Sequence, residues 1–255
     1  MIAVAACHGS APSDLYYAWD DRRVLCSDPI DDLTGMTRNW TAAEGRFRDA
    51  EQHAWVTLVH AHVPDIEVMP PTATSNVLTP TVSIAALERV FGWADQYHLD
   101  YVRFDELTPD TPRAGVAFAF DDESVDEWFA LRPIFTAHHA KVTFFVTRWD
   151  TLTPAQLAEL AQLSADGHDL EPHTVNHVNA TDYVRDHGLP AYMTDEVLPS
   201  IQVMTAAGYH PTSLAYPFGV HDEAIDEAVL QHLDRVRTTP GECPAADSPE
   251  ADPED

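Results

Sequence analysis

Basic side chains are scarce in this 255-residue sequence. It has 14 Lys and Arg against 42 Asp and Glu, which gives a formal net charge of −28, and Lys141 is its one lysine. Such an acidic chain repels phosphate backbones and anionic lipid headgroups, so we expect no nucleic acid and no charged membrane surface among its partners. A neutral or cationic substrate fits this charge better.

Long hydrophobic runs are absent as well. No apolar stretch approaches the ~20 residues that a membrane-spanning helix needs, so we expect no transmembrane segment. The hydrophobic content of 45%, with 6 Trp, 8 Tyr and 10 Phe, is instead typical of a folded domain with a sizeable core.

The sequence also contains only three cysteines. Cys7, Cys26 and Cys243 are spaced neither like a zinc ribbon nor like a C-x-x-C redox pair. Residues 4–7 resemble the lipobox of bacterial lipoproteins, but the six residues before Cys7 cannot hold a complete signal peptide, so either the sequence starts too late or the match is fortuitous. If Cys7 carries a lipid, Cys26 and Cys243 remain, and we expect them to lie close enough to bridge in an oxidising envelope.

Composition divides the chain into three parts. Residues 1–53 mix short apolar pieces with Asp-rich turns and are interpreted as an N-terminal extension, with Cys7 as a candidate lipid anchor. Residues 54–243 form the main domain. Residues 244–255 are rich in Asp, Glu, Pro and Ala, bury too little apolar surface to fold, and are expected to be disordered.

Strand-like and helix-like patterns alternate through the main domain. Expected strands are 56–62, 101–104, 115–120, 142–147, 168–172, 213–216 and 235–238. Expected helices are 83–96, a segment around 128–135, one that Thr153 caps and Gly167 ends, about 195–207, and 222–233. Seven strands alternating with helices predict an α/β fold with parallel strands, and an irregular (β/α)7 barrel rather than an open sheet.

Two pairs of residues have the chemistry of a metal site. Asp121 and Asp122 directly follow an expected strand, although other Asp doublets show that such a pair also arises by chance. His173 and His177 are four apart, which on a helix places both imidazoles on one face, within reach of one metal ion. With 14 histidines this spacing too is only weakly specific when taken alone.

The positions of both pairs in the predicted fold support a functional role for them. Asp121, His173, Phe218 and His62 each lie at the carboxyl end of an expected strand. In a β/α barrel these ends converge on one face, where catalytic groups collect. The sequence therefore predicts one site made from several strand ends.

These segments resemble the polysaccharide deacetylases of the NodB-homology type, also called carbohydrate esterase family 4. The three motifs that carry the resemblance are Ala119-Phe120-Asp121-Asp122-Glu123, His173-Thr174-Val175-Asn176-His177 and Ala215-Tyr216-Pro217-Phe218-Gly219. The resemblance extends over about 54–243 and implies a distorted barrel of seven β/α units. It also implies a hydrolase that acts on carbon–nitrogen bonds and removes N-acetyl groups from an amino-sugar polysaccharide. The candidate lipid anchor and the cysteine pair lead us to expect the protein in the cell envelope or the extracellular space.

The resemblance assigns roles to individual residues. Asp122, His173 and His177 are expected to bind one divalent metal ion, with zinc preferred over cobalt, nickel, manganese or iron. Asp121 is expected to be the general base. The backbone N–H of Phe218, with Tyr216 and Pro217 beside it, is expected to hold the oxyanion and the substrate.

The chain departs from the family pattern at three places. Glu123 replaces a glycine beside the metal ligand, and Ala215 stands where many relatives have an arginine that contacts the base. The usual C-terminal Leu-x-x-His, which supplies the general acid, is missing from its place. We therefore expect the acid on strand 56–62, with His62 as the first candidate and His60 as the second.

That placement is similar to circularly permuted members of the family, in which the histidine strand comes first and strand 235–238 closes beside it. Arg148 and Trp149 follow another strand end, where an aromatic ring is suited to stack on a sugar. Two alternatives stay open: an O-acetyl esterase or another amidase on the same fold, and an envelope carbohydrate-binding module that kept the metal and lost turnover.

Overall fold

The computed structural model describes residues 15–32, 38–66 and 80–243. The candidate anchor Cys7 and the acidic tail 244–255 lie outside these ranges. Within them, no helix is both long enough and apolar enough to cross a bilayer.

Parallel strands form the centre of the fold. The largest sheet has the order β4 (Val56–Ala61), β8 (Gly115–Asp122), β9 (Thr143–Val146) and β10 (Asp169–Pro172), all parallel. Three short strands join it: β1 (Tyr16–Tyr17) is antiparallel to β4, β3 (Asp28–Pro29) is parallel to β4, and β7 (Asp100–Tyr101) pairs with the start of β8. The predicted α/β class with parallel strands is confirmed.

A second sheet has the order β11 (Ser213–Ala215), β12 (Arg235–Thr238) and β2 (Val24–Cys26), again parallel. Strand β2 continues through Ser27 into β3, so one stretch of chain connects the two sheets. The predicted neighbourhood of 235–238 and 56–62 is wrong, because β2 and β3 lie between them. These strands are only two or three residues long, too short for a periodic pattern to reveal them.

The two sheets are not hydrogen-bonded to each other between β10 and β11 in the part of the chain that is described. There the side chain of Glu171 makes the hydrogen bonds that join the two strands, in place of backbone pairing. Its carboxylate accepts hydrogen bonds from the backbone N–H groups of Thr212 (2.9 Å) and Ser213 (3.1 Å) and from the Thr212 hydroxyl (2.8 Å). Backbone hydrogen bonds therefore do not confirm the closed barrel that the strand count predicts.

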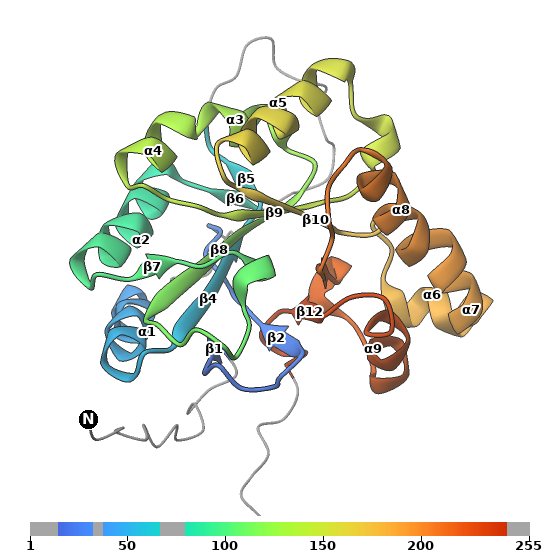
Figure 1. Ribbon diagram of the computed structural model, residues 1–255, viewed down its shortest axis with the longest axis horizontal. Helices are drawn as coiled ribbons and strands as arrows, with labels where there is room; N and C mark the ends of the chain where they lie inside the picture. Colours follow the sequence, from blue (N-terminus) through green and yellow to red (C-terminus); the bar gives the residue numbers. More distant parts are fainter. Residues whose placement is uncertain (1–14, 33–37, 67–79, 244–255) are drawn as a thin grey trace, which may run out of the picture.

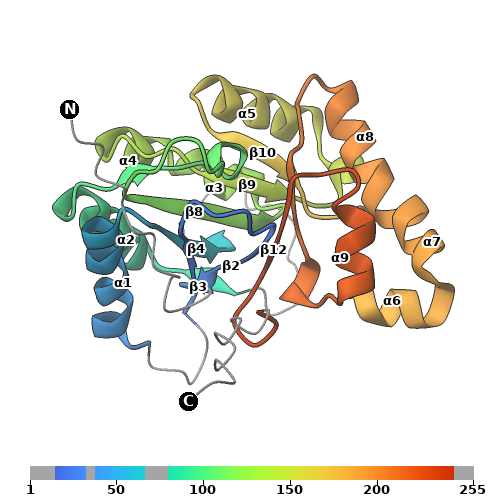
Figure 2. The ribbon, with the colours of Figure 1, turned by 60° about the horizontal axis from the view of Figure 1, so that its bottom comes forward.

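Helices surround the strands (Figures 1 and 2). The helices are α1 (Trp40–His53), α2 (Ile84–Gln96), α3 (Val125–Ala130), α4 (Arg132–Ala137), α5 (Pro154–Ala165), α6 (Ala180–His187), α7 (Leu189–Tyr192), α8 (Leu198–Ala206) and α9 (Glu223–Val229). Short elements are β5 (Val63–Pro64), β6 (Thr81–Val82), the 3₁₀ turns Phe104–Glu106, Trp149–Thr151 and Pro217–Gly219, and a π-helical turn Met193–Val197. Figure 1 shows α2 to α5 beside β8 and β9, and α6 to α9 at the other end of the molecule.

Local sequence signals account for the best-defined helix boundaries. In α5 the Thr153 hydroxyl accepts from the Gln156 N–H, the Gln156 side chain accepts from the Thr153 N–H, and Pro154 is the first helical residue. This is the predicted capping box. The helix expected around 128–135 is interrupted at Leu131, since Pro133 lacks the N–H that a continuous helix would use.

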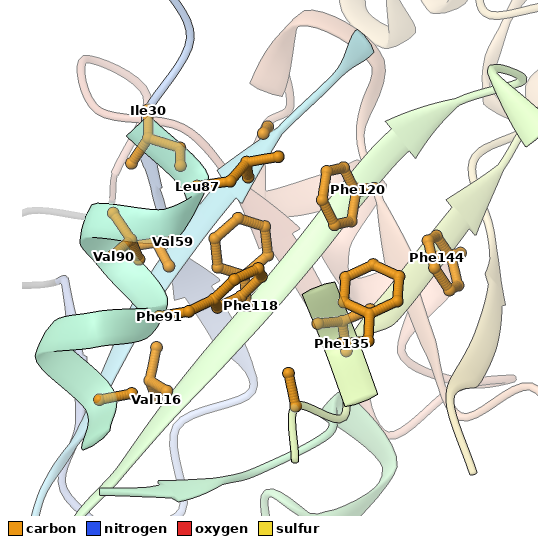
Figure 3. Packing of buried hydrophobic residues seen from close by; sticks show 14 of the residues in the cluster. Ile30, Val59, Leu87, Val90, Phe91, Val116, Phe118, Phe120, Phe135 and Phe144 are labelled. Carbon is orange, nitrogen blue, oxygen red and sulfur yellow. The ribbon is translucent and has the colours of Figure 1, made fainter. Parts of the chain in front are cut away.

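Side chains of strand β8 alternate between two hydrophobic cores, and Figure 3 shows the outer one. Phe118 and Phe120 point outward, where Phe118 packs on Phe91 of α2 with ring centroids 5.0 Å apart. Ala117 and Ala119 point to the inner core, which strands of both sheets share. Successive strand side chains alternate between faces, so the next inward residue after Ala119 is Asp121, which is 2% exposed. The strand itself thus delivers a carboxylate to the interior.

Residues 15–32 and 38–53, which the sequence assigns to an extension, supply β1 to β3 and α1 to this structure. Cys26 at the end of β2 forms a disulfide with Cys243 after β12, and their Cα atoms are 5.6 Å apart. The predicted proximity of these two cysteines is confirmed. The bridge fastens the N-terminal strands to the C-terminal end of the described chain.

We expect the disulfide to stabilise the fold strongly, because it spans 217 residues of sequence. The chain-entropy model assigns about 5 kcal/mol to so long a loop, and measured losses are typically about 2–5 kcal/mol. Cys26→Ser should lower the free energy of unfolding by this amount in urea titrations. A reductant should lower the wild-type value equally and leave Cys26→Ser unchanged; equal stability of both proteins without reductant would contradict the prediction.

Candidate metal and catalytic site

The three predicted metal ligands come together at the carboxyl ends of β8 and β10. The Oδ1 atom of Asp122 lies 3.1 Å from Nε2 of His177 and 3.7 Å from Nε2 of His173. One donor atom from each of the three residues lies within 4.8 Å of the others. One ion could contact all three donors.

The prediction that His173 and His177 share a helical face is wrong. Strand β10 ends at Pro172, and residues 173–179 form a loop before α6. Thr174 (φ 63°) and His177 (φ 58°) have left-handed backbone conformations that turn both rings to the same side, with centroids 4.9 Å apart. Tertiary contacts hold this loop, since the Thr147 hydroxyl donates to the Thr174 carbonyl and the Arg148 N–H donates to the Val175 carbonyl.

His173 is in the chemical state that a divalent ion requires. Nδ1–H of His173 donates to the Ala215 carbonyl (2.8 Å), which leaves Nε2 as a lone pair directed at the site. Burial lowers the pKa of His173 to about 4, so its ring is neutral near pH 7. Among the described residues, the buried Oδ1 of Asp122 has no partner in hydrogen-bond geometry. One carboxylate and two imidazole side chains suit Zn²⁺ or a similar ion.

Asp121 lies on the inner side of the same strand end, paired with the fully buried guanidinium of Arg237 from β12. Burial alone would raise the pKa of Asp121, but the charge of Arg237 lowers it below its usual value. Asp121 is therefore ionised in the interior.

Arg237 was not among the residues predicted from the sequence. Ala215 stands where many relatives have an arginine, and Arg237 on the neighbouring strand β12 provides a guanidinium instead. The sequence does carry one signal for Arg237. In Arg235-Val236-Arg237 the two arginines are two residues apart, so both lie on the same face of an expected buried strand. Buried arginines need an anionic partner, and the inward Asp121 provides one.

His60 and His62 both approach Asp121, with donor atoms of the three residues within 4.8 Å of one another. Burial, then the charge of Arg237, lowers the pKa of His60 well below its usual value, and its Nδ1 is hydrogen-bonded to the Ser27 hydroxyl (2.7 Å). His60 is thus neutral.

His62 is different because it has a carboxylate partner that sequence reasoning missed. Its Nδ1 lies 2.7 Å from Oδ2 of Asp31, and its backbone N–H donates to Oδ1 of the same residue (2.9 Å). Burial would lower the pKa of His62, but the hydrogen bond and charge of Asp31, with Asp121 and Asp122, raise it to about 9. The ring is therefore a cation at neutral pH.

His60, His62 and Asp121 form a second group of donors close enough for a metal ion. An ion there would share Asp121 with the guanidinium of Arg237, and the two positive charges would repel each other. The cationic His62 adds to that repulsion. These charges disfavour a metal ion in this second group of donors.

In the motif around Pro217, the side chain of Phe218 lies at the exposed edge of the candidate site beside His177, here called the rim. Phe218 is 61% exposed, has a left-handed backbone (φ 60°), and places its ring 4.8 Å from that of His177. Tyr216 is buried, and its hydroxyl donates to Asp226 of α9 (2.8 Å), so its side chain faces away from the rim. Pro217 is buried between them.

Glu123 and Arg148 form an ion pair at this rim. Nη1 of Arg148 donates to both carboxylate oxygens of Glu123, at 2.8 and 2.9 Å. The following residue, Trp149, lines a cavity of about 140 Å³ with Thr174, Val175 and side chains of α8. The structure thus places Arg148 beside the candidate metal ligands and Trp149 behind the loop that carries the two histidines.

Comparison with known proteins shows which family part of this chain is similar to. Residues 108–234 match the family model described as polysaccharide deacetylase. This segment, just under half of the chain, is thus similar to the polysaccharide deacetylase family. The matched deacetylase segment contains Asp121, Asp122, His173, His177 and Phe218, whereas His60 and His62 precede it and Arg237 follows it. No curated protein sequence matches the chain.

Solved structures share the fold. The deacetylase PplD of Streptococcus pyogenes, in complex with acetate, has a TM-score of 0.55 at 19% identity, over 69% of this chain and 79% of that one. A de-N-acetylase from Aggregatibacter actinomycetemcomitans has a TM-score of 0.55 at 15% identity, over 71% and 85%. A polysaccharide deacetylase from Bacillus cereus has a TM-score of 0.56 at 15% identity, but only 57% of its length is covered, by 72% of this chain. The circular permutation stays a prediction.

The Asp31–His62 contact predicts how His62 titrates. Asp31→Asn removes the negative charge that stabilises the imidazolium, so the ring should lose its proton about 1–3 pH units lower than in wild type, where the pKa is raised to about 9. Histidine ring signals in an NMR pH titration, with His62→Gln for assignment, measure this. Asp234→Asn, at an exposed carboxylate, is the control; an unchanged His62 titration in Asp31→Asn would contradict the prediction.

Proposed function

We propose that the protein is a metal-dependent hydrolase that removes N-acetyl groups from an amino-sugar polysaccharide. The observation that carries the proposal is the juxtaposition of two sets at one strand end: the donors Asp122, His173 and His177, and the ionised, buried Asp121 beside them. A deacetylase needs a metal ion and a base within one site, and similarity to the family supports the same reaction.

Asp122, His173 and His177 would hold one divalent ion, with Zn²⁺ as our first choice from the donor set. A bound ion of this kind polarises the acyl oxygen and makes a water molecule more acidic. The protein itself would stabilise the negative charge that develops on the acyl oxygen. The backbone N–H of Phe218, in the turn Pro217–Gly219, is our candidate donor to the acyl oxygen as negative charge builds on it.

Asp121 is the proposed general base. It takes a proton from the water as the water oxygen bonds to the acyl carbon. Arg237 keeps the carboxylate ionised and fixes its direction from inside the fold. A base held this way needs no reorganisation when the substrate arrives.

His62 is the proposed general acid. As the carbon–nitrogen bond breaks, the sugar amine needs a proton, and the His62 imidazolium carries one at neutral pH because Asp31 stabilises it. His60, the second candidate, is neutral and fully enclosed, so its geometry suits support of Asp121 better than proton donation.

The rim supports a carbohydrate as the substrate. Phe218 exposes an aromatic ring beside His177, and Trp149 lies at a mostly apolar cavity next to the same loop. Aromatic faces of this kind pack on sugar rings. The net charge of −28 favours a neutral or cationic amino sugar over an anionic polymer.

We also place the protein outside the cytoplasm, in the envelope or the extracellular space. The Cys26–Cys243 disulfide supports this, since such bridges persist in oxidising compartments. Lipidation of Cys7 would add an anchor, and mass spectrometry of the protein from membranes of its own cells would show the added mass.

Acetate release tests the function. The protein should release acetate from N-acetylated chito-oligosaccharides, lose this activity with a chelator and regain it with Zn²⁺. Release from O-acetyl xylan alone would make it an esterase instead, and metal binding without any acetate release would make it a binding module.

Two substitutions separate the roles of the adjacent carboxylates. Asp121→Asn should keep its metal and lower turnover by ~10²–10⁴, the usual contribution of a positioned base. Asp122→Asn should lose the metal. Metal analysis beside initial rates measures both effects, and equal metal loss in the two variants would show that the roles are divided wrongly.

Trp149→Ala should weaken binding of the polymer without slowing the reaction of bound substrate. Loss of one aromatic contact of about 0.5–1.5 kcal/mol raises KM by roughly 2- to 13-fold. The control is Trp40→Ala, a partly buried tryptophan of α1 that packs on Trp93 (ring centroids 5.9 Å apart). A fall in kcat at constant KM would contradict a binding role for Trp149.

A further inference from the structure

Glu196 is a buried carboxylate that the chemistry above does not use. It is 1% exposed and lies on the π-helical turn Met193–Val197 between α7 and α8. Pro199 accounts for this turn, because it has no N–H for the carbonyl of Asp195 four residues earlier and its ring crowds that carbonyl. Single π turns within helices are frequent at functional sites.

Both oxygens of Glu196 contact one residue of the metal-ligand loop. Oε2 accepts from the backbone N–H of Asn176 (2.8 Å), and Oε1 accepts from its side-chain amide (2.7 Å). Asn176 is itself exposed and directly precedes His177. A polar side chain buried at a cost in solvation thus holds an exposed loop residue through two hydrogen bonds.

This loop needs to be held from outside. Left-handed φ values at Thr174 and His177 cost about 1–3 kcal/mol each and persist only where surrounding contacts enforce them. Thr147 and Arg148 provide two such contacts from the end of β9, both to the first half of the loop. Glu196 provides the contacts to the second half, next to His177.

We infer that Glu196 is a positioning residue for the metal ligand His177. It acts through Asn176, whose two hydrogen bonds fix the backbone from which the His177 ring is presented to Asp122. The inference rests on the proposed metal site. Partners behind the metal ligands commonly change metal affinity by about 10- to 100-fold when they are removed.

Substitutions that exchange hydrogen-bond donor and acceptor between Glu196 and Asn176 test the positioning role. Glu196→Gln places an NH₂ group against the NH₂ group of Asn176, and Asn176→Asp places a carboxylate against a carboxylate; each single change breaks one hydrogen bond. The double variant restores the match, because the amide introduced at position 196 can donate to the new carboxylate while its oxygen still accepts from the backbone N–H. Glu227→Gln, at an exposed position of α9, controls for the loss of one negative charge.

The readout is the dissociation constant for Zn²⁺, measured by competition with a chromophoric chelator well below the unfolding temperature of every variant. We expect both single variants to bind Zn²⁺ about 10- to 100-fold more weakly, the double variant to return to within about threefold of wild type, and Glu227→Gln to match wild type. If Glu196→Gln does not fold, Asn176→Asp makes the same comparison from an exposed position.

A lower unfolding temperature with unchanged Zn²⁺ affinity in the single variants would overturn the inference and leave Glu196 with a structural role. Failure of the double variant to recover affinity would also overturn it. A wild-type protein that binds no Zn²⁺ would instead overturn the proposed function, and this inference with it, so the two failures are distinguishable.

Discussion

The ion pair between Asp121 and Arg237 is the constraint on which the rest of the site depends. It joins β8 of one sheet to β12 of the other, and both side chains are withdrawn from water. Two such charges are tolerated only together, because either one alone would remain buried and unpaired. His60 and His173 lie close to the pair and stay neutral, which avoids further charge in the interior.

Adjacent carboxylates acquire different surroundings from this arrangement. Asp121 continues the inward alternation of β8 and meets Arg237, whereas Asp122 adopts a positive φ (87°) and turns toward His173 and His177. One carboxylate is therefore enclosed and ion-paired, while the other has a buried oxygen directed at two imidazoles. This division of environment underlies the proposed division between base and metal ligand.

Side chains complete the fold where backbone pairing stops. Glu171 connects β10 to β11, the Cys26–Cys243 disulfide connects the ends of the described chain, and Ser27 links the sheets while it holds His60. The N-terminal strands thereby bring Asp31 to His62. A segment that looks like an appendage in sequence thus supplies a partner for a site residue.

The sequence by itself determined the parallel α/β class, the capping box of α5, the cysteine pair and the motif residues at the strand ends. Each of these depends on local periodicity or on chemistry that short motifs record. Only the tertiary structure decided that Arg237 pairs with Asp121, that Asp31 pairs with His62, and that His173 and His177 meet through a loop rather than a helix. These contacts join segments distant along the chain, and residue spacing carries no information about which buried charge will meet which partner.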